Sequence, residues 1–194
     1  SPSTGLGFQS VPLHVADSLV VPPGYTTKVL LRWGDPLFYG VPRMTLDNAT
    51  AELQELTFGY NCYLNVFFPH ENSASGLMVV NHEYTEGARM FRDYTPATAT
   101  REQVDIELAA HGVTVFELTH EGNDWAVNRL SPYNRRITGA TPIEITGPLR
   151  GHVSMKTQAD PSGTVVAGML NNCAGGRTLW GTVLTAEENF HQYF

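Results

Sequence analysis

The chain has 194 residues, of which 42% are hydrophobic and 16% charged, and its formal net charge is -7. This length supports a single domain with a real core, and the hydrophobic content excludes a disordered chain. The acidic balance excludes a nucleic-acid-binding surface, and no apolar run approaches the ~18 residues of a membrane span. Because Gly (18) and Pro (12) are frequent, we expect strands and turns rather than long exposed helices.

Short segments rich in β-branched and apolar residues run along the chain, each bounded by Gly, Pro, Asn or Asp, which is typical of strands. In chain order the predicted strands are Thr26–Trp33, Cys62–Phe68, Leu77–Tyr84, Val113–Thr119, Trp125–Leu130, His152–Thr157, Thr164–Leu170 and Leu179–Glu187. Most connections between them are short. This arrangement favours the antiparallel meanders of a sandwich, a barrel or propeller blades.

The sequence predicts a helix in each of two segments. Asn48–Leu56 contains mostly good helix formers. Thr100–Ala110 begins with Thr100 and Gln103 in the spacing of a capping box, and Gly112 stands where a C-terminal cap glycine is expected. The chain is therefore predicted to be all-β with minor helices.

A closed propeller of four-stranded blades needs at least ~16 strands. The strands predicted here would make roughly two such blades. If the chain is part of a propeller, further chain is needed to close the ring.

The segment Asn81-His82-Glu83-Tyr84 places a carboxylate directly after a hydrophobic strand. It is not a zinc-protease motif, because position 86 is Glu rather than the second His. Glu83 is either a solvated strand end or a metal ligand that faces a polar channel.

Leu170–Gly176 is the most unusual segment, because two asparagines and a cysteine are followed by small residues. Such a loop can surround an ion with amide oxygens and a thiolate, or it can be a tight turn with a buried, inert cysteine. The two cysteines, Cys62 and Cys173, are compatible with a disulfide, with two buried thiols or with one metal thiolate.

Glu187 and Glu188 follow an apolar strand. On a strand, two consecutive side chains point to opposite faces, so only one of these carboxylates can face a given site. Oxygen ligands in this position suit a hard cation such as Ca²⁺. The alternative is a charged strand edge.

Segments along nearly the whole chain resemble the PhoX family of alkaline phosphatases, the calcium-dependent enzymes that are unrelated to the zinc-dependent ones. The matching segments are Gly7–Val11, Val21–Tyr25, Trp33–Pro36, Phe58–Asn61, Val80–Tyr84, Tyr133–Thr138, Ile145–Pro148, Leu170–Gly176, Trp180–Thr182 and Glu187–Phe190. So many colinear matches make the resemblance specific.

The resemblance implies a six-bladed β-propeller that hydrolyses phosphomonoesters, with two ferric ions (Fe³⁺) and calcium ions (Ca²⁺) in its central channel. Cys173 resembles the thiolate that bridges the irons, and Glu83 and Glu188 resemble carboxylate ligands of the cluster, so these three are the predicted catalytic and metal-binding residues. Glu187 is a weaker metal-ligand candidate. The thiolate role disfavours a disulfide between Cys173 and Cys62.

Members of the family are several hundred residues longer, so residues 1–194 correspond to the N-terminal portion of a single propeller domain. We expect a second chain or a C-terminal portion to complete the propeller, and small phosphate esters to be the substrates. The resemblance also implies a periplasmic or secreted protein, whose signal peptide is absent from this chain. The alternatives are a non-catalytic propeller scaffold and a hydrolase of the same fold that acts on another ester.

Overall fold

The computed structural model describes residues 5, 7–71 and 73–193 of the chain. It divides into two units, Ser1–Leu30 and Leu31–Phe194, which are described separately. In the first unit a turn is closed by a hydrogen bond from Tyr25 N to Pro22 O (3.1 Å). The rings of Phe8 and Tyr25 meet edge to face with their centroids 6.0 Å apart.

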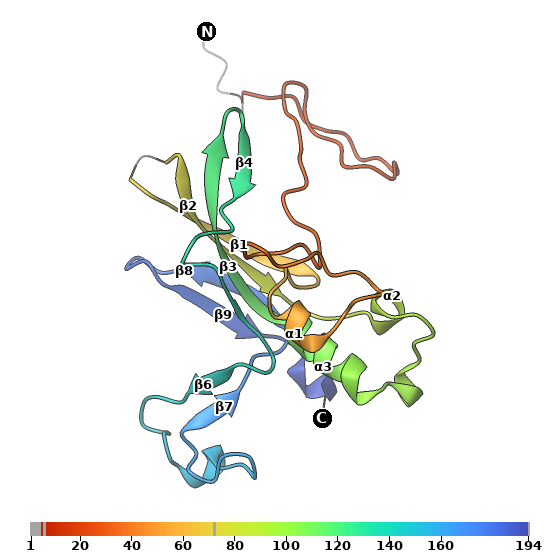
Figure 1. The fold of residues 1–194 in the computed structure, drawn as a ribbon. Helices are drawn as coiled ribbons and strands as arrows, with labels where there is room; N and C mark the ends of the chain where they lie inside the picture. The colour runs from red at the N-terminus through yellow and green to blue at the C-terminus, as the bar shows by residue number, and fades with distance from the viewer. Residues whose placement is uncertain (1–4, 6, 72, 194) are drawn as a thin grey trace. The chain divides into compact units, whose positions relative to one another are not determined.

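The second unit contains all of the helices and strands of the described residues (Figure 1). In chain order they are α1 (Ala51–Gln54), β1 (Cys62–Pro69), β2 (Ser75–His82), α2 (Gly87–Met90), η1 (Pro96–Thr98), α3 (Arg101–Ala110), β3 (Gly112–Glu121), β4 (Asp124–Val127), β5 (Arg135–Ile137), β6 (Pro142–Glu144), η2 (Val153–Met155), β7 (Val165–Ala167), β8 (Asn172–Arg177), β9 (Val183–Glu187) and η3 (Phe190–Tyr193). The predicted class, mostly β-sheet with few helices, is confirmed. In the part of the chain that the structure describes, no helix has the length and apolar character required to span a membrane.

The main sheet has five strands, paired antiparallel in the order β1-β2-β3-β4, with β5 beside the first half of β3. Two separate hairpins follow, β6–β7 and β8–β9. The centre of the main sheet is buried because Val79, Val113 and Val115 pack in one cluster with side chains that include Met169 and Val183. The β8–β9 hairpin thus shares its core with the main sheet, and β8 lies against β1.

Helix α3 forms as its capping signals predict. The hydroxyl of Thr100 accepts a hydrogen bond from Gln103 N, and the side chain of Gln103 accepts one from Thr100 N. The helix ends at Ala110, and Gly112 has a φ of +93°, a conformation that favours glycine. The helix buries Ile106 and Ala110 against Met90.

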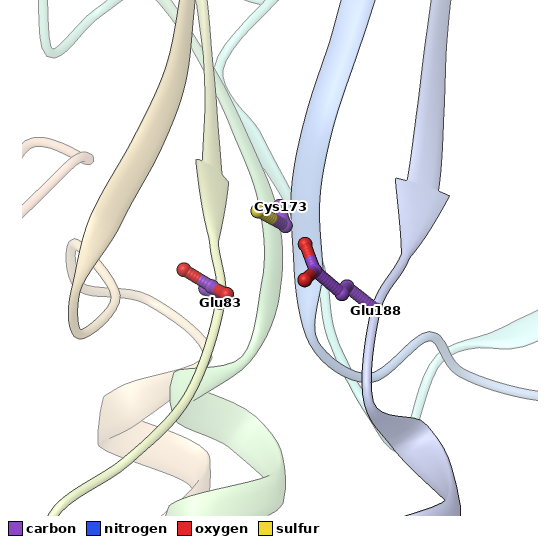
Figure 2. Close-up of side chains that lie close together, drawn as sticks. All are labelled: Glu83, Cys173 and Glu188. Atoms are coloured by element: carbon purple, nitrogen blue, oxygen red, sulfur yellow. The ribbon is translucent and has the colours of Figure 1, made fainter.

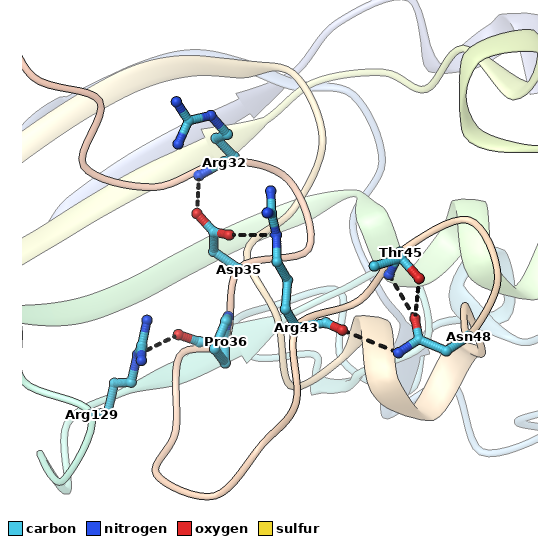
Figure 3. Close-up of polar contacts among 7 residues, drawn as sticks. All are labelled: Arg32, Asp35, Pro36, Arg43, Thr45, Asn48 and Arg129. Carbon is cyan, nitrogen blue, oxygen red and sulfur yellow. Dashed lines mark hydrogen bonds and ion pairs between the residues drawn. The ribbon is translucent and has the colours of Figure 1, made fainter.

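The segment before α1 is held by side-chain hydrogen bonds and an ion pair (Figure 3). One carboxylate oxygen of Asp35 accepts a hydrogen bond from Arg32 N (2.7 Å), and the other pairs with the guanidinium of Arg43 (3.0 Å). Arg129 donates to Pro36 O (3.1 Å). These bonds fix the loop that inserts the fully buried Leu37 into the core.

Several predicted elements are wrong. No strand forms over 26–33, and the segment predicted as strand His152–Thr157 contains the 3-10 helix η2 instead. The helix predicted over Asn48–Leu56 shortens to α1. The segment Leu170–Gly176, treated as a loop, contributes most of strand β8, while β5 and β6 were not predicted.

Candidate metal centre

Three side chains converge where β2, β8 and β9 approach one another (Figure 2). Glu83 follows the end of β2, Cys173 lies in β8, and Glu188 follows the end of β9. The sulfur of Cys173 and one carboxylate oxygen from each glutamate all lie within 4.8 Å of one another. Cys173 is buried, Glu83 is half-buried and Glu188 is exposed, so the group opens from the protein interior to solvent.

The register of β8 explains how Cys173 reaches this group. Asn172 pairs with Glu187 and Gly175 pairs with Thr185, so two residues of β8, Cys173 and Ala174, lie opposite a single residue of β9. This is a β-bulge, which bends a strand and redirects its side chains.

Asn81 connects the main sheet to that bulge. Its fully buried side chain donates from Nδ2 to Cys173 O (2.8 Å). Asn172, also buried, donates from Nδ2 to Thr185 Oγ1 (3.0 Å). The Oδ1 atoms of Asn81 and Asn172 are buried and have no hydrogen-bond partner among the described residues. Asn81, which binds the main chain of Cys173, and Asn172, which precedes Cys173, therefore each carry a buried oxygen acceptor for which the described residues supply no donor.

The electrostatics of the group favour a cation. Burial first, and then the nearby Glu188 and Glu83, raise the pKa of Cys173 to about 11. Without a positive charge the thiol therefore keeps its proton. A bound metal ion reverses this balance, because it deprotonates a coordinating thiol. The donor set fits the implied metals, since thiolate and carboxylate suit iron and carboxylate oxygens suit calcium.

The main chain of Glu83 is held by a hydrogen bond from His111. The ring of His111 donates from Nδ1 to Glu83 O (2.8 Å). Burial, with a smaller contribution from Arg136, lowers the pKa of His111 to about 4 despite the opposite effect of the bond to Glu83. His111 is therefore neutral at physiological pH, and its main-chain oxygen accepts from Arg136 (3.0 Å).

Arg136 also organises His82, the residue before Glu83. Its guanidinium donates to Thr114 Oγ1 (3.0 Å), and that oxygen lies 2.6 Å from His82 Nε2. On the other side of the ring, Nδ1 lies 3.1 Å from Tyr60 O, which can only accept. The neutral ring thus carries its proton on Nδ1 and accepts the Thr114 hydroxyl proton at Nε2. Burial and then Arg136 hold the pKa of His82 well below its ordinary value.

The predicted residues differ in their placement. Glu83, Cys173 and Glu188 come together, whereas Glu187 lies outside the group, and its Oε1 accepts from Leu170 N (2.7 Å). Both cysteines are free thiols, so the disulfide alternative is not realised. Asn81 and His111 were not predicted. The segment Val80–Tyr84 drew attention to Glu83, but nothing in the sequence distinguishes His111 from the other scattered histidines.

A family model described as alkaline phosphatase PhoX matches residues 6–194. The chain belongs to the PhoX family. A solved structure described as Pseudomonas fluorescens PhoX in complex with vanadate, a transition state analogue, is 40% identical and superposes with a TM-score of 0.87. The match covers 95% of this chain and 32% of that PhoX chain, so the present chain spans about a third of its PhoX relative. A comparison with curated proteins found no match.

Proposed function

We propose that this chain supplies part of the active site of a metal-dependent alkaline phosphatase that releases inorganic phosphate from phosphomonoesters. The observation that carries the proposal is the convergence of Glu83, Cys173 and Glu188 within 4.8 Å in a member of the PhoX family. A vanadate complex of the Pseudomonas fluorescens relative supports a phosphoryl-transfer site in the family.

Cys173 would hold two ferric ions through its thiolate, and Glu83 and Glu188 would contribute carboxylate oxygens to the iron and calcium ions. When bound, these cations neutralise phosphate oxygens and stabilise the charge that develops in an in-line displacement. The protein's own contribution is positional. Asn81 fixes the main chain of Cys173, and His111 fixes that of Glu83.

The proposal includes a part of the enzyme that these 194 residues do not supply. The chain spans 32% of its PhoX relative, and we propose that a C-terminal portion or a second chain supplies the remaining ligands and closes a six-bladed propeller. Small phosphate esters would enter its central channel. Following the family, we place the protein outside the cytoplasm, in the periplasm or secreted.

The first test is elemental analysis of the protein purified without chelator, together with hydrolysis of p-nitrophenyl phosphate at alkaline pH. We expect iron and calcium in near-integral ratio to the assembled protein. Absence of both, or zinc alone, would reject the proposed centre. A panel with phosphodiesters, phosphotriesters and lactones tests the substrate class, and turnover of those compounds without phosphomonoesterase activity would contradict it.

The matching mutation is Cys173→Ala, with Cys62→Ala as its control. Cys173 is a buried member of the cluster, whereas Cys62 is an exposed free thiol. We expect Cys173→Ala to lose bound iron and phosphatase activity, and Cys62→Ala to retain both. Retention of iron and turnover by Cys173→Ala would refute the thiolate assignment.

A further inference from the structure

Arg136 extends its side chain from β5 to the C-terminal end of α3. Its Nη2 donates to Ala109 O (2.6 Å) and to His111 O (3.0 Å). The last carbonyls of a helix have no partner within the helix and carry partial negative charge, so a cation is favoured there. The guanidinium therefore closes α3 from a neighbouring strand.

The other arm of the guanidinium reaches the end of β2. Nη1 donates to Thr114 Oγ1 (3.0 Å), which lies 2.6 Å from Nε2 of His82. A hydroxyl has a single hydrogen, so Thr114 accepts from Arg136 and donates to His82. The His82 ring cannot shift in response, because it packs edge to face on Phe58 and a Cβ added to Gly59 would lie only 2.6 Å from its Cγ.

Both arms lead to the main chain of Glu83. His82 precedes Glu83 in the chain, and His111 donates from Nδ1 to Glu83 O (2.8 Å). On its other side, Glu83 N donates to Asn61 O (3.0 Å). The two histidines that Arg136 holds are thus the residues that adjoin or bind Glu83, whose carboxylate lies with the candidate metal centre.

Stability alone does not explain a guanidinium at this position. Nε of Arg136 is buried and has no hydrogen-bond partner among the described residues, and an unpaired buried donor costs free energy. Apolar residues of similar volume often replace buried charged groups without loss of stability. What the planar guanidinium adds is a set of donors that bond at two separate points, the end of α3 and the hydroxyl of Thr114.

We propose that Arg136 is a positioning residue of the candidate metal centre, which fixes the main chain of Glu83 by holding His82 and His111 with one guanidinium. The proposal rests on the proposed function, because its consequence for metal binding requires Glu83 to be a ligand. Residues that orient metal ligands without touching the metal strengthen metal binding. Loss of Arg136 should therefore weaken the centre without removing a ligand.

The first test compares Arg136→Met and Arg136→Lys with Arg135→Met in the assembled, metal-loaded protein. Arg135 is the matched control, because it is the exposed neighbour on β5 and donates to Tyr133 O instead of α3 or β3. Iron retention is measured by dialysis against a graded series of chelator concentrations. We expect Arg136→Met to weaken retention by roughly 10-fold, and Arg135→Met to leave it unchanged.

Arg136→Lys should lie between Arg136→Met and the wild type. An ammonium group can bond to the carbonyls of α3 but cannot also span to Thr114, so it restores one arm of the contact. If circular dichroism shows that Arg136→Met is unfolded, Arg136→Lys carries the comparison. Wild-type retention by the folded Arg136 variants would overturn the proposal.

A double-mutant cycle distinguishes action through Glu83 from a general loosening of the fold. In a Glu188→Asp background, the Arg136 substitution should weaken iron retention by its full factor. In a Glu83→Asp background it should weaken retention much less, because the residue that it positions is already impaired. Equal factors in the two backgrounds would overturn the proposal.

Hydrogen exchange of the metal-free protein gives a readout that does not depend on iron. The amide of Glu83 should lose protection in the Arg136 variants and keep it in Arg135→Met. Unchanged protection in folded Arg136 variants would overturn the hold of Arg136 on Glu83 and leave the proposed function intact. Wild-type protein that binds no iron would overturn the proposed function, and the role of Arg136 in a metal centre with it.

Discussion

At the scale of single residues, the ligands of the candidate centre are held through their main chains. Asn81 donates to the carbonyl of Cys173 and His111 donates to that of Glu83. Both donors are buried, so these bonds are shielded from competition by water. The ligand side chains are thereby left to face the shared space of the centre.

The buried histidines make stability depend on pH. Burial lowers the pKa of His111 to about 4 from an ordinary 6.5, and that of His82 well below the same value. Between about pH 4 and pH 6.5 these histidines therefore bind more protons in the unfolded state than in the folded state. The free energy of unfolding should therefore fall as pH decreases from 6.5 towards 4, with a slope of up to about 1.4 kcal/mol per pH unit for each histidine.

The measurement is urea unfolding of protein stripped of metal with a chelator, repeated across this pH range. His111→Gln keeps a side-chain N–H donor but cannot take up the proton, so its profile should be flatter than that of the wild type. Identical slopes in the two proteins would contradict the assignment of a neutral, buried His111.

At the scale of elements, the sequence pattern predicts the strands that form the centre of the main sheet. β1, β2 and β3 are dense in Val, Phe and Leu, and each was expected within a few residues of its observed bounds. β8 was missed because its sequence, Asn-Cys-Ala-Gly-Gly-Arg, has low strand propensity. Its strand conformation depends on pairing with β9 and on contact with β1, which are tertiary effects.

Neighbouring glycines in β8 offer a matched test of this packing. A Cβ at Gly175 would collide with Leu184 O, whereas one at Gly176 would meet no atom within 4 Å. Gly175→Ala should therefore push β9 away, displace Glu188 and weaken iron retention by roughly 10-fold, as expected when the support of a metal ligand is disturbed. Gly176→Ala should retain iron normally.

Iron remaining after dialysis against a graded series of chelator concentrations gives this comparison directly. Circular dichroism shows whether either variant has unfolded. Equal retention by the two variants would mean that the close approach of β1, β8 and β9 does not position the ligands.

At the scale of the whole molecule, the composition of the candidate site could not be derived from residue patterns alone. Those patterns singled out Glu83, Cys173 and Glu188 as separate candidates with alternatives, and the resemblance to PhoX joined them. Their convergence depends on how the β8–β9 hairpin packs against β1 and β2. Such contacts between segments far apart in the chain leave no signal in the local pattern of hydrophobic and polar residues.

The β8–β9 hairpin exposes large apolar side chains. Leu179 is 103% exposed, Trp180 77% and Leu184 67%. Between the hairpin and the main sheet lies a cavity of about 520 Å³, lined by side chains that include Phe68 and Met169. Exposed apolar groups gathered in this way are typical of surfaces that another part of a protein covers.

We predict that the further chain of the proposed enzyme covers this hairpin. The emission of Trp180 should then lie at long wavelength when residues 1–194 are studied alone, and at shorter wavelength when the remainder of the enzyme is supplied. Trp180→Phe identifies the contribution of this residue against those of Trp33 and Trp125. An emission spectrum that does not change on assembly would show that the hairpin stays in water.

β1 and β8 each contain a bulge, at Tyr63–Leu64 and at Cys173–Ala174, and these two bulges limit how this sequence can vary. Each bulge inserts one residue into its strand. The alternation of side chains between the two faces of the strand is therefore interrupted at the bulge and nowhere else in these paired regions. Deletion of Leu64 or Ala174 would remove the bulge, leave the paired residues beyond it in their present pairs and displace the neighbouring side chain, that of Tyr63 or Cys173. The centre thus tolerates exchanges of side chains around it far better than changes in length, and alignment gaps at these two positions would mark relatives that have lost it.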